Sequence, residues 1–336
     1  MSNRKTLSLV MAAAAVLSTV SSNALPSMAK EAGDRPHMDL AFCIDTTGSM
    51  QHEIDMVKTK TKELVAKLST GKPAPIVRVG LVAYRDRGDE YVTKVFPFSD
   101  NIDQVVKDIS SLKAAGGGDG PESVNEGLHV ALNSLDWGTE KGTAKLLFLI
   151  GDAGPHDYPG DYKWDEESKK AIARGIQVNT IACSGLENYP GSRGVDVFKQ
   201  IAKLTDGKYD TLAYRSEIVD ASGKRETVVT AAGATYKMRA GERDWKAAAA
   251  SGRMDKAVMA ASPAPMESSL VAGRLLRRGY YAGSKGLPAS AKAEGFAAGG
   301  GGMASYSTPA RGDSNLDELV LGAAREKAKK QLNVSY

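Results

Sequence analysis

Residues 38–50 read MDLAFCIDTTGSM, and this stretch decides the fold. Its first seven residues, MDLAFCI, form a mostly apolar run of strand length, which is typical of a strand buried on both faces of a sheet. The polar sequence DTTGS follows at once, and from residue 50 to residue 68 apolar side chains recur every three or four positions. This spacing predicts a helix. The sequence therefore predicts a buried strand that passes through a short polar turn into a helix.

The alternation of strand and helix patterns continues to about residue 215. We expect further strands at 76–84, 91–98, 145–150, 176–183 and 208–213, and helices at 103–112, from Pro121 onward, at 164–174 and at 195–204. The short link before 91–98 indicates that this strand runs antiparallel to the one before it. Residues 37–215 are therefore predicted to form one α/β domain, a doubly wound and mostly parallel six-stranded sheet with an antiparallel edge strand.

The first 29 residues are typical of a secretory signal peptide. Arg4 and Lys5 provide a positive start, residues 7–20 carry no charge and are mostly apolar, and two sites with small residues that suit cleavage follow at 22–24 and 27–29. The alternative is a membrane anchor, but the apolar run is short for a span of ~20 residues. We expect an exported chain, periplasmic or secreted, that has no stable membrane span after cleavage.

The C-terminal third has a different composition. Residues 216–239 suggest a hairpin around Ser222 and Gly223, and residues 240–314 are rich in Ala, Gly, Ser and Pro, which predicts a flexible segment. Residues 315–333 show helical spacing and are expected to form an amphipathic helix that docks on the domain or binds a partner. We expect the last hundred or so residues to be mostly dispensable for folding.

Charge and cysteine content exclude some partners and bonds. The formal net charge is +4, and removal of Arg4 and Lys5 would leave +2, too little to indicate nucleic acid or an acidic membrane as the partner. Cys43 and Cys183 fall on strands that we expect to be separated by the strand 145–150. Strands two apart lie ~9.6 Å from each other, beyond the ~7 Å limit for the Cα atoms of a disulfide. We therefore expect two free thiols.

The polar turn after the first strand carries metal-ligating groups. Asp45, Thr47 and Ser49 alternate along the chain, so their oxygens can point toward one position. One carboxylate and two hydroxyls form a set of hard oxygen ligands, which suits Mg²⁺, with Mn²⁺ or Ca²⁺ as alternatives.

Two further loops are expected at the same edge of the sheet. The strand 145–150 runs into Gly151 and Asp152, and the glycine-rich loop before the helix at Pro121 carries Asp119 and Glu122. Ligands of open parallel sheets bind at the carboxyl ends of the strands, where the strand order reverses. Glu122 is also interpreted as a first-turn residue that interacts favourably with the helix dipole.

Three motifs in order, DTTGSM, GGGDGPE and LIGDAGPH, resemble those of von Willebrand factor type A domains. The resemblance covers roughly residues 37–215 and is closest to exported bacterial members. It implies a metal-ion-dependent adhesion site to which Asp45, Thr47, Ser49 and Asp152 contribute. Many members add a threonine from the middle loop, and this sequence has none at the obvious place. Asp119 is our first choice for that role and Glu122 the second.

The resemblance also implies a function. In this family the metal keeps an open coordination position that a carboxylate of a protein partner fills, and no catalytic group is needed. We therefore expect a metal-dependent adhesion or scaffold module of the cell envelope, not an enzyme. Two alternatives stay open: an Mg²⁺-dependent hydrolase of phosphatase type, suggested by the spacing of Asp45 and Thr47, and a structural envelope protein with an empty metal site.

Overall fold

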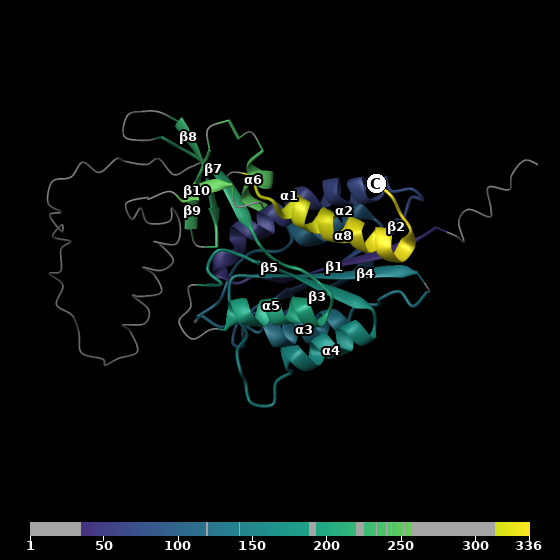
Figure 1. Cartoon of the computed structure of the whole chain (residues 1–336). Helices are drawn as coiled ribbons and strands as arrows, with labels where there is room; N and C mark the ends of the chain where they lie inside the picture. The colour runs from purple at the N-terminus through teal and green to yellow at the C-terminus, as the bar shows by residue number, and fades with distance from the viewer. Residues whose placement is uncertain are drawn as a thin grey trace, which may run out of the picture. The chain divides into compact units, whose positions relative to one another are not determined.

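The structure is a computed structural model of the chain (Figure 1). It describes residues 35–118, 120–140, 142–187, 193–219, 225–232, 234–239, 241–242, 244–250, 253–256 and 313–336. The predicted signal segment 1–29 lies outside the described residues, as does Asp119.

A six-stranded sheet forms the centre of the domain, and the prediction of its topology is confirmed. The strand order is β3-β2-β1-β4-β5-β6, with all neighbours parallel except β2 and β3. The strands are β1 (His37–Asp45), β2 (Ile76–Tyr84), β3 (Thr93–Ser99), β4 (Thr143–Gly151), β5 (Ile176–Ala182) and β6 (Tyr209–Thr211). The apolar runs of β1 and β4 place these two strands side by side at the middle of the sheet.

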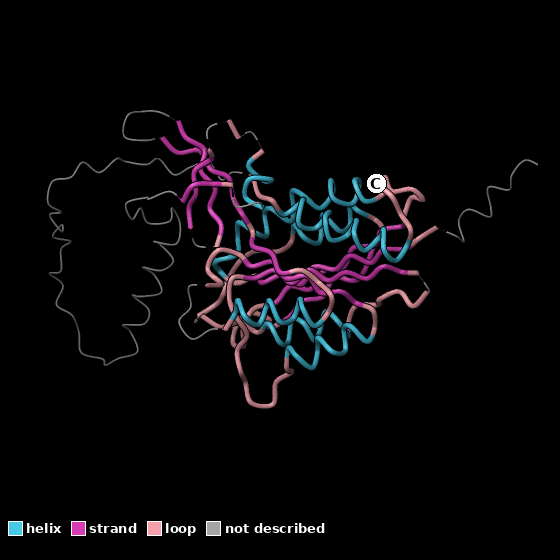
Figure 2. Tube along the Cα trace, viewed as in Figure 1, coloured by secondary structure: helices cyan, strands magenta, loops and turns pink. Residues whose placement is uncertain are grey.

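Helices cover both faces of this sheet (Figures 1 and 2). One face is covered by α1 (Gln51–Leu68), α2 (Ile102–Ser110) and α8 (Leu316–Leu332), and the other by α3 (Val124–Asn133), α4 (Trp164–Ala173) and α5 (Gly194–Leu204). Successive residues of β1 alternate between the two cores: Phe42 and Ile44 pack on the α1 side, and Ala41 and Cys43 on the α3 side. Both faces of β1 are therefore buried, as its mostly apolar sequence predicts.

A second, four-stranded antiparallel sheet follows β6. Its order is β10-β9-β8-β7, with β7 (Ala213–Val219), β8 (Arg225–Ala231), β9 (Ala234–Met238) and β10 (Met254–Lys256), and the short helix α6 (Trp245–Ala250) lies between its last two strands. The hairpin expected at 216–239 is thus part of a larger sheet. The segment 240–314, predicted to be flexible throughout, begins with α6 and β10, and its residues 257–312 lie outside the described residues.

The chain returns from this second sheet to the main domain beside β7. Residues 313–315 run antiparallel to the start of β7: Arg215 N donates to Asp313 O at 2.9 Å, and Ala213 N donates to Asn315 Oδ1 at 2.9 Å. Helix α8 begins directly afterwards and buries Leu316, Val320 and Ala324 in the same core as α1 and β1. The expectation that the last hundred residues are dispensable is therefore wrong for α8, which completes one face of the core.

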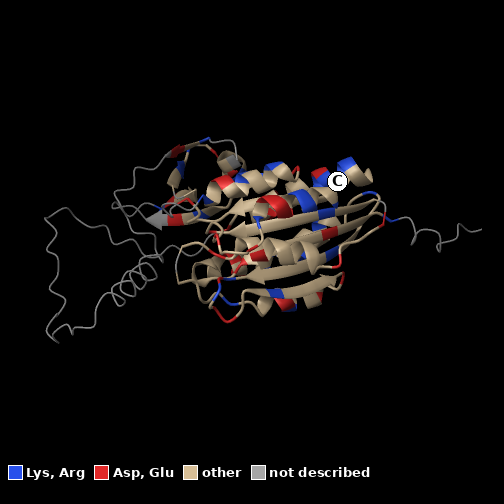
Figure 3. Cartoon of the chain, turned by 90° about the horizontal axis from the view of Figure 1, so that it is seen from below, with Lys and Arg blue, Asp and Glu red and all other residues tan. Residues whose placement is uncertain are grey.

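Ion pairs fix the start of α8. Lys246 of α6 donates to Asp317 Oδ1 at 2.8 Å and to Glu318 Oε1 at 2.9 Å, and Lys60 of α1 lies 2.6 Å from Asp313 Oδ1. Burial alone would lower the pKa of Lys246, but its bonds to Asp317 and Glu318 outweigh this and raise it. Acidic and basic residues are both present on the helices (Figure 3).

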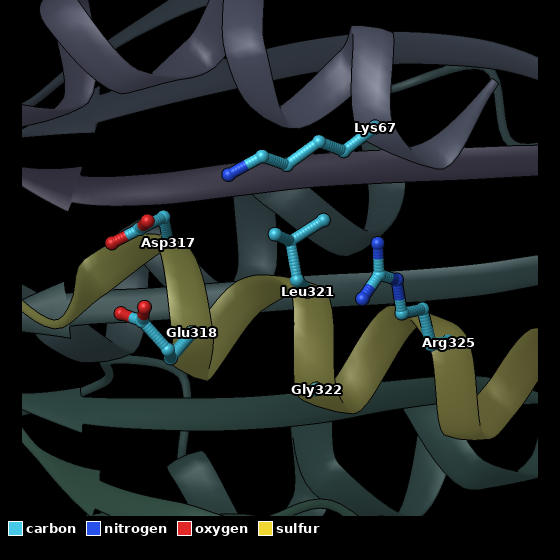
Figure 4. Close-up of a pocket in the computed structure, with 6 residues that line it drawn as sticks. All are labelled: Lys67, Asp317, Glu318, Leu321, Gly322 and Arg325. Atoms are coloured by element: carbon cyan, nitrogen blue, oxygen red, sulfur yellow. The ribbon is translucent and has the colours of Figure 1, made fainter. Parts of the chain in front are cut away.

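The contact between α1 and α8 leaves a shallow pocket of about 320 Å³. Figure 4 shows its lining: Lys67 comes from α1, and the other side chains come from α8, namely Asp317, Glu318, Leu321, Gly322 and Arg325.

Among the described residues, no helix has both the length and the apolar content that a membrane crossing requires.

Both cysteines are buried and free, which confirms the expectation from strand order. Strand β4 lies between the strand of Cys43 and the strand that Cys183 follows. Burial raises the pKa of both thiols, and the Asp45 charge adds to the effect at Cys43.

We expect the native protein to resist a water-soluble thiol reagent and the denatured, unreduced protein to react at both thiols. A denatured protein with no reactive thiol would contradict this strand order.

The packing of α8 gives a second prediction. Leu316 is 1% exposed, so Leu316→Ala should lower the free energy of unfolding by about 2–5 kcal/mol. Gly322 is a matched control on the same helix, because a Cβ there would meet nothing within 4 Å. Gly322→Ala should raise the free energy of unfolding by about 0.5–1 kcal/mol. Urea denaturation measures both, and a neutral Leu316→Ala would show that α8 does not complete the core.

Candidate metal centre

Three loops meet at the carboxyl ends of β1 and β4. The turn after β1 is bonded to the glycine-rich loop, since Ala115 N donates to Thr46 O at 3.1 Å and Gly48 N donates to Gly116 O at 3.3 Å. The glycine-rich loop is in turn bonded to the loop after β4, since Glu122 N donates to Gly154 O at 2.9 Å. Backbone hydrogen bonds therefore hold the three predicted motifs together at one edge of the sheet.

Asp45 lies at the centre of this arrangement and is completely buried. Its Oδ1 accepts hydrogen bonds from Thr47 N at 2.8 Å and from Thr47 Oγ1 at 2.7 Å. Its Oδ2 is buried and has no hydrogen-bond partner among the described residues. Burial raises the pKa of Asp45 well above its usual range, and the charge of Asp152 raises it further, although the two bonds from Thr47 lower it.

The other predicted ligands occupy different positions around Asp45. Thr47 is buried, whereas Ser49 is exposed in the 3-10 turn η2 (Gly48–Met50) that leads into α1. Asp152 is 5% exposed and directly follows β4, next to the strand that ends in Asp45. The structure therefore places Asp45, Thr47 and Asp152 in the interior at one edge of the sheet and leaves Ser49 exposed.

Glu122 is placed differently from the sequence expectation. Helix α3 begins at Val124 and not at Pro121, so Glu122 is not in its first turn. The segment before the helix is extended, and it pairs with the loop after β4 at Pro155. Glu122 is 1% exposed, and its Oε2 has no hydrogen-bond partner within the described part of the chain. Burial raises the pKa of Glu122 to about 10, with further contributions from the Asp45 and Asp86 charges.

A tyrosine lies beneath the carboxylates. Tyr84 ends β2, and its hydroxyl would be 2.5 Å from a Cβ placed on Gly151. This hydroxyl is also buried without a hydrogen-bond partner among the residues that the structure describes. A glycine at position 151 therefore leaves room for the Tyr84 hydroxyl beside the end of β4.

The loop between β2 and β3 contributes residues that the sequence reasoning missed. Asp89 accepts a hydrogen bond from Gly117 N at 3.1 Å, and Asp86 accepts from Ser123 Oγ at 2.8 Å and from Tyr158 Oη at 2.7 Å. These carboxylates position the glycine-rich loop and the loop after β4. The available signal was the acidic sequence RDRGDE directly after β2, whose carboxyl end lies at the same edge as that of β1.

The segment 157–167 lies against this loop. His156 stacks on Tyr158 with ring centroids 4.4 Å apart, and its Nε2 is 3.4 Å from Asp86 Oδ2. Arg87 pairs with Asp161 at 3.3 Å. His156 therefore packs near the site, against the loop between β2 and β3.

The candidate site depends on hydroxyls as well as carboxylates. No group of three or more His, Cys, Asp and Glu side chains in the described ranges is arranged to hold a metal ion. Asp45, Thr47 and Asp152 instead offer two carboxylates and a hydroxyl, and the unpaired Oδ2 of Asp45 is a buried acceptor. Such donors fit a hard divalent cation better than a soft one.

The glycine-rich loop provides a test of how its position is held. Gly116 has φ +79°, and a Cβ there would overlap the Asp89 carboxylate, whereas a Cβ on Gly118 would meet nothing within 4 Å. Gly116→Ala should therefore cost about 1–3 kcal/mol of unfolding free energy, and Gly118→Ala should stay within about 0.5 kcal/mol of the parent. Chemical denaturation measures both. Equal stability of the two variants would show that Asp89 does not fix this loop.

Comparisons with known proteins agree with the motifs. A family model described as "von Willebrand factor A domain" matches residues 39–217. The von Willebrand factor A domain-containing protein 7 of Homo sapiens is 34% identical over 122 residues, which are 36% of this chain and 12% of that protein. The alpha-protein kinase vwkA of Dictyostelium discoideum is 29% identical over 120 residues, which are 35% of this chain and 19% of that protein. The chain thus spans less than a fifth of the length of these two relatives.

Among solved structures, the conserved hypothetical protein BatB from Bacteroides thetaiotaomicron is similar over 52% of this chain and 89% of that chain, with 17% identity and a TM-score of 0.38. The fold assignment rests instead on the family model and on the observed strand order. Because the family model covers more than half of the sequence, the chain belongs to the von Willebrand factor A domain family, whose members are known as protein-interaction or adhesion modules.

Proposed function

We propose that this chain binds one divalent cation, Mg²⁺ or alternatively Mn²⁺ or Ca²⁺, at the edge of its sheet, and binds a protein partner through that ion. The ligands would be Asp45, Thr47, Ser49 and Asp152, together with a carboxylate of the middle loop, Asp119 or Glu122. The bound ion would supply an open coordination position for an oxygen atom of the partner, a carboxylate or another group.

One observation carries the proposal. Asp45 is fully buried, its Oδ1 is held by Thr47, and its Oδ2 is without a partner in the described ranges. An isolated buried carboxylate costs several kcal/mol unless a counter-charge is present. The carboxylate of Asp152, which is close enough to raise the pKa of Asp45, increases that cost. A divalent cation between the two would offset both desolvation and repulsion.

The roles of the side chains follow from their positions. Thr47 orients the Asp45 carboxylate and keeps lone pairs on its own hydroxyl for a cation. Ser49 is exposed at the mouth, where a ligand to the cation and a partner group can both reach it. Asp86 and Asp89 hold the surrounding loops by hydrogen bonds and therefore act as positioning residues.

The proposed function is binding rather than catalysis. A phosphatase of the type suggested by the Asp45 and Thr47 spacing needs a second aspartate as general acid, and a threonine hydroxyl cannot serve in that role near neutral pH. We further propose that the chain is exported and that its partner is a component of the cell envelope or its surroundings, an inference that rests on the signal-like residues 1–29.

Thermal unfolding tests the cation site. A ligand that binds only the native state stabilises it by about 2–3 kcal/mol at a hundredfold excess over its dissociation constant. We expect the melting temperature in saturating Mg²⁺ to exceed that in EDTA, and we expect Asp45→Ala to remove the difference. Asp108→Ala, at a half-buried position on α2, should keep it. Equal melting temperatures of the parent protein in EDTA and Mg²⁺ would favour a structural protein with an empty site.

A pulldown from envelope extract tests the partner. The parent protein should retain a partner in Mg²⁺ and release it in EDTA, and Asp45→Ala should not retain it in either. Retention that is independent of both the metal and Asp45 would separate partner binding from the metal site. Turnover of a generic aryl phosphate in Mg²⁺ that is lost in Asp45→Ala would instead support the hydrolase alternative.

A further inference from the structure

We propose that the pocket between α1 and α8 is a second, metal-independent binding site, in which the guanidinium of Arg325 binds the carboxylate of an aspartate or glutamate side chain of a protein partner. The pocket is lined by side chains of two helices that cover one face of the main sheet. None of the loops of the candidate metal centre lines it. This surface is therefore separate from the edge at which a cation is proposed to bind.

The guanidinium of Arg325 has no acceptor in the part of the chain that the structure describes. Its Nε is buried without a hydrogen-bond partner, and no ion pair among the described residues includes Arg325. The acid next to it in sequence, Glu326, already pairs with Lys208 and Lys330. Figure 4 shows the guanidinium pointing from α8 toward α1, at the pocket that it lines. A half-buried cation without a carboxylate leaves a position that an anionic ligand can fill through strong, charge-assisted bonds.

The last residues of the chain hold this guanidinium in place. Its central carbon lies 5.0 Å from the centre of the Tyr336 ring. Lys72 N donates to Ser335 O at 2.8 Å and Ser335 N donates to Lys72 O at 3.0 Å, and a Cβ on Gly71 would come within 3.0 Å of the Tyr336 ring. An aromatic face attracts a cation without using its N–H donors. Arg325 is therefore oriented while donors remain for the two parallel bonds that a carboxylate accepts.

The other charged side chains of the pocket already have partners. Lys246 lies 2.8 Å from Asp317 and 2.8 Å from Glu318. Lys67 pairs with an acid one turn before it on α1, and in the view of Figure 4 its ammonium lies toward Asp317. Arg325 therefore carries the one charge of the pocket that the described residues leave unpaired. A carboxylate monoanion matches this charge, whereas a phosphate dianion would bring an extra negative charge close to Asp317 and Glu318.

The middle of the pocket fits the aliphatic part of an acidic side chain. Leu321 lies between Asp317 and Arg325 in Figure 4, and Gly322 beside it is exposed, with nothing within 4 Å of a Cβ placed there. Methylene groups can lie over these two residues while the carboxylate reaches Arg325. A long apolar chain would instead end against the carboxylates of Asp317 and Glu318. Because the pocket is shallow, the acidic group is best held there by a protein surface that presents it.

Side-chain NMR of the purified protein in EDTA tests the site, because EDTA keeps any cation site empty and separates this result from the proposed function. The probe is N-acetylglutamate α-amide, which carries one carboxylate, and N-acetylglutamine α-amide is its neutral counterpart. The carboxylate probe should shift the Arg325 Nε resonance saturably, and the neutral probe should bind at least about tenfold more weakly. Equal affinity of the two probes, or no saturable shift at Arg325, overturns the inference.

Two charge variants locate the carboxylate, with the backbone amides of α8 as the reporter. Arg325→Gln should weaken binding of the carboxylate probe by at least about tenfold. Lys329→Gln is the matched control, because it removes the same charge from an exposed position one turn later on α8. That exposed charge is screened by salt, so the control should change the affinity by less than about threefold. Equal effects of the two variants would show a general attraction to positive charge and would overturn the assignment to Arg325.

Filling the pocket tests the site without changing Arg325, and it stays decisive if Arg325→Gln does not fold. Gly322→Leu places a side chain in the open space at an exposed helix position. Leucine favours a helix more than glycine does, so this variant should melt no lower than the parent, and it should lose the carboxylate probe. Parent-like binding by folded Gly322→Leu would overturn the pocket as the site. Dianionic methyl phosphate should bind more weakly than the carboxylate probe, and tighter binding would overturn the ligand class.

Discussion

The carboxylate of Asp45 is completely buried at the end of a central strand, and the surrounding architecture depends on this constraint. β1 lies between β2 and β4, and the Asp45 side chain at its end is fully buried, so its carboxylate depends on the surrounding loops for polar contacts. Thr47 binds one oxygen, and the glycine-rich loop and the loop after β4 close over the site through backbone bonds. A buried acid with a second acid beside it is unfavourable for stability alone, which is why we interpret the edge as a binding site.

A second feature of the structure is that the helix that completes the hydrophobic core is separate from the loops that form the candidate site. Helix α8 completes the core on the face of the main sheet opposite α3. It follows the second sheet in the sequence. Lys60 of α1 pairs with Asp313 across 253 positions of sequence, and Lys246 of α6 binds Asp317 at the start of α8. These ion pairs join α6 to the start of α8, and the residue before α8 to α1, which is also the helix that follows the Asp45 turn.

The sequence predicted the elements whose signals are local. The mostly apolar run of β1 and the continuous apolar run of β4 identified both as central strands, and the polar turn after β1 identified Asp45 and Thr47. The functions of Asp86 and Asp89 were missed because they depend on how the β2–β3 loop folds back over the glycine-rich loop, which no local pattern encodes. Glu122 was assigned to a helical turn because Pro121 suits a first helical position, but pairing with Pro155 extends the chain through that point. The sequence predicted the helix of α8 and docking as one of its two outcomes, but not the elements that it packs against, since these are remote in sequence.

The central claim, that a divalent cation lies between Asp45 and its neighbours, is tested most directly by anomalous diffraction from crystals of the protein grown with Mn²⁺. The account predicts one strong anomalous peak at the carboxyl edge of the sheet, in contact with Asp45 and Asp152. Crystals that diffract well at saturating Mn²⁺ but show no peak at Asp45, or show it at a different place, would contradict the account.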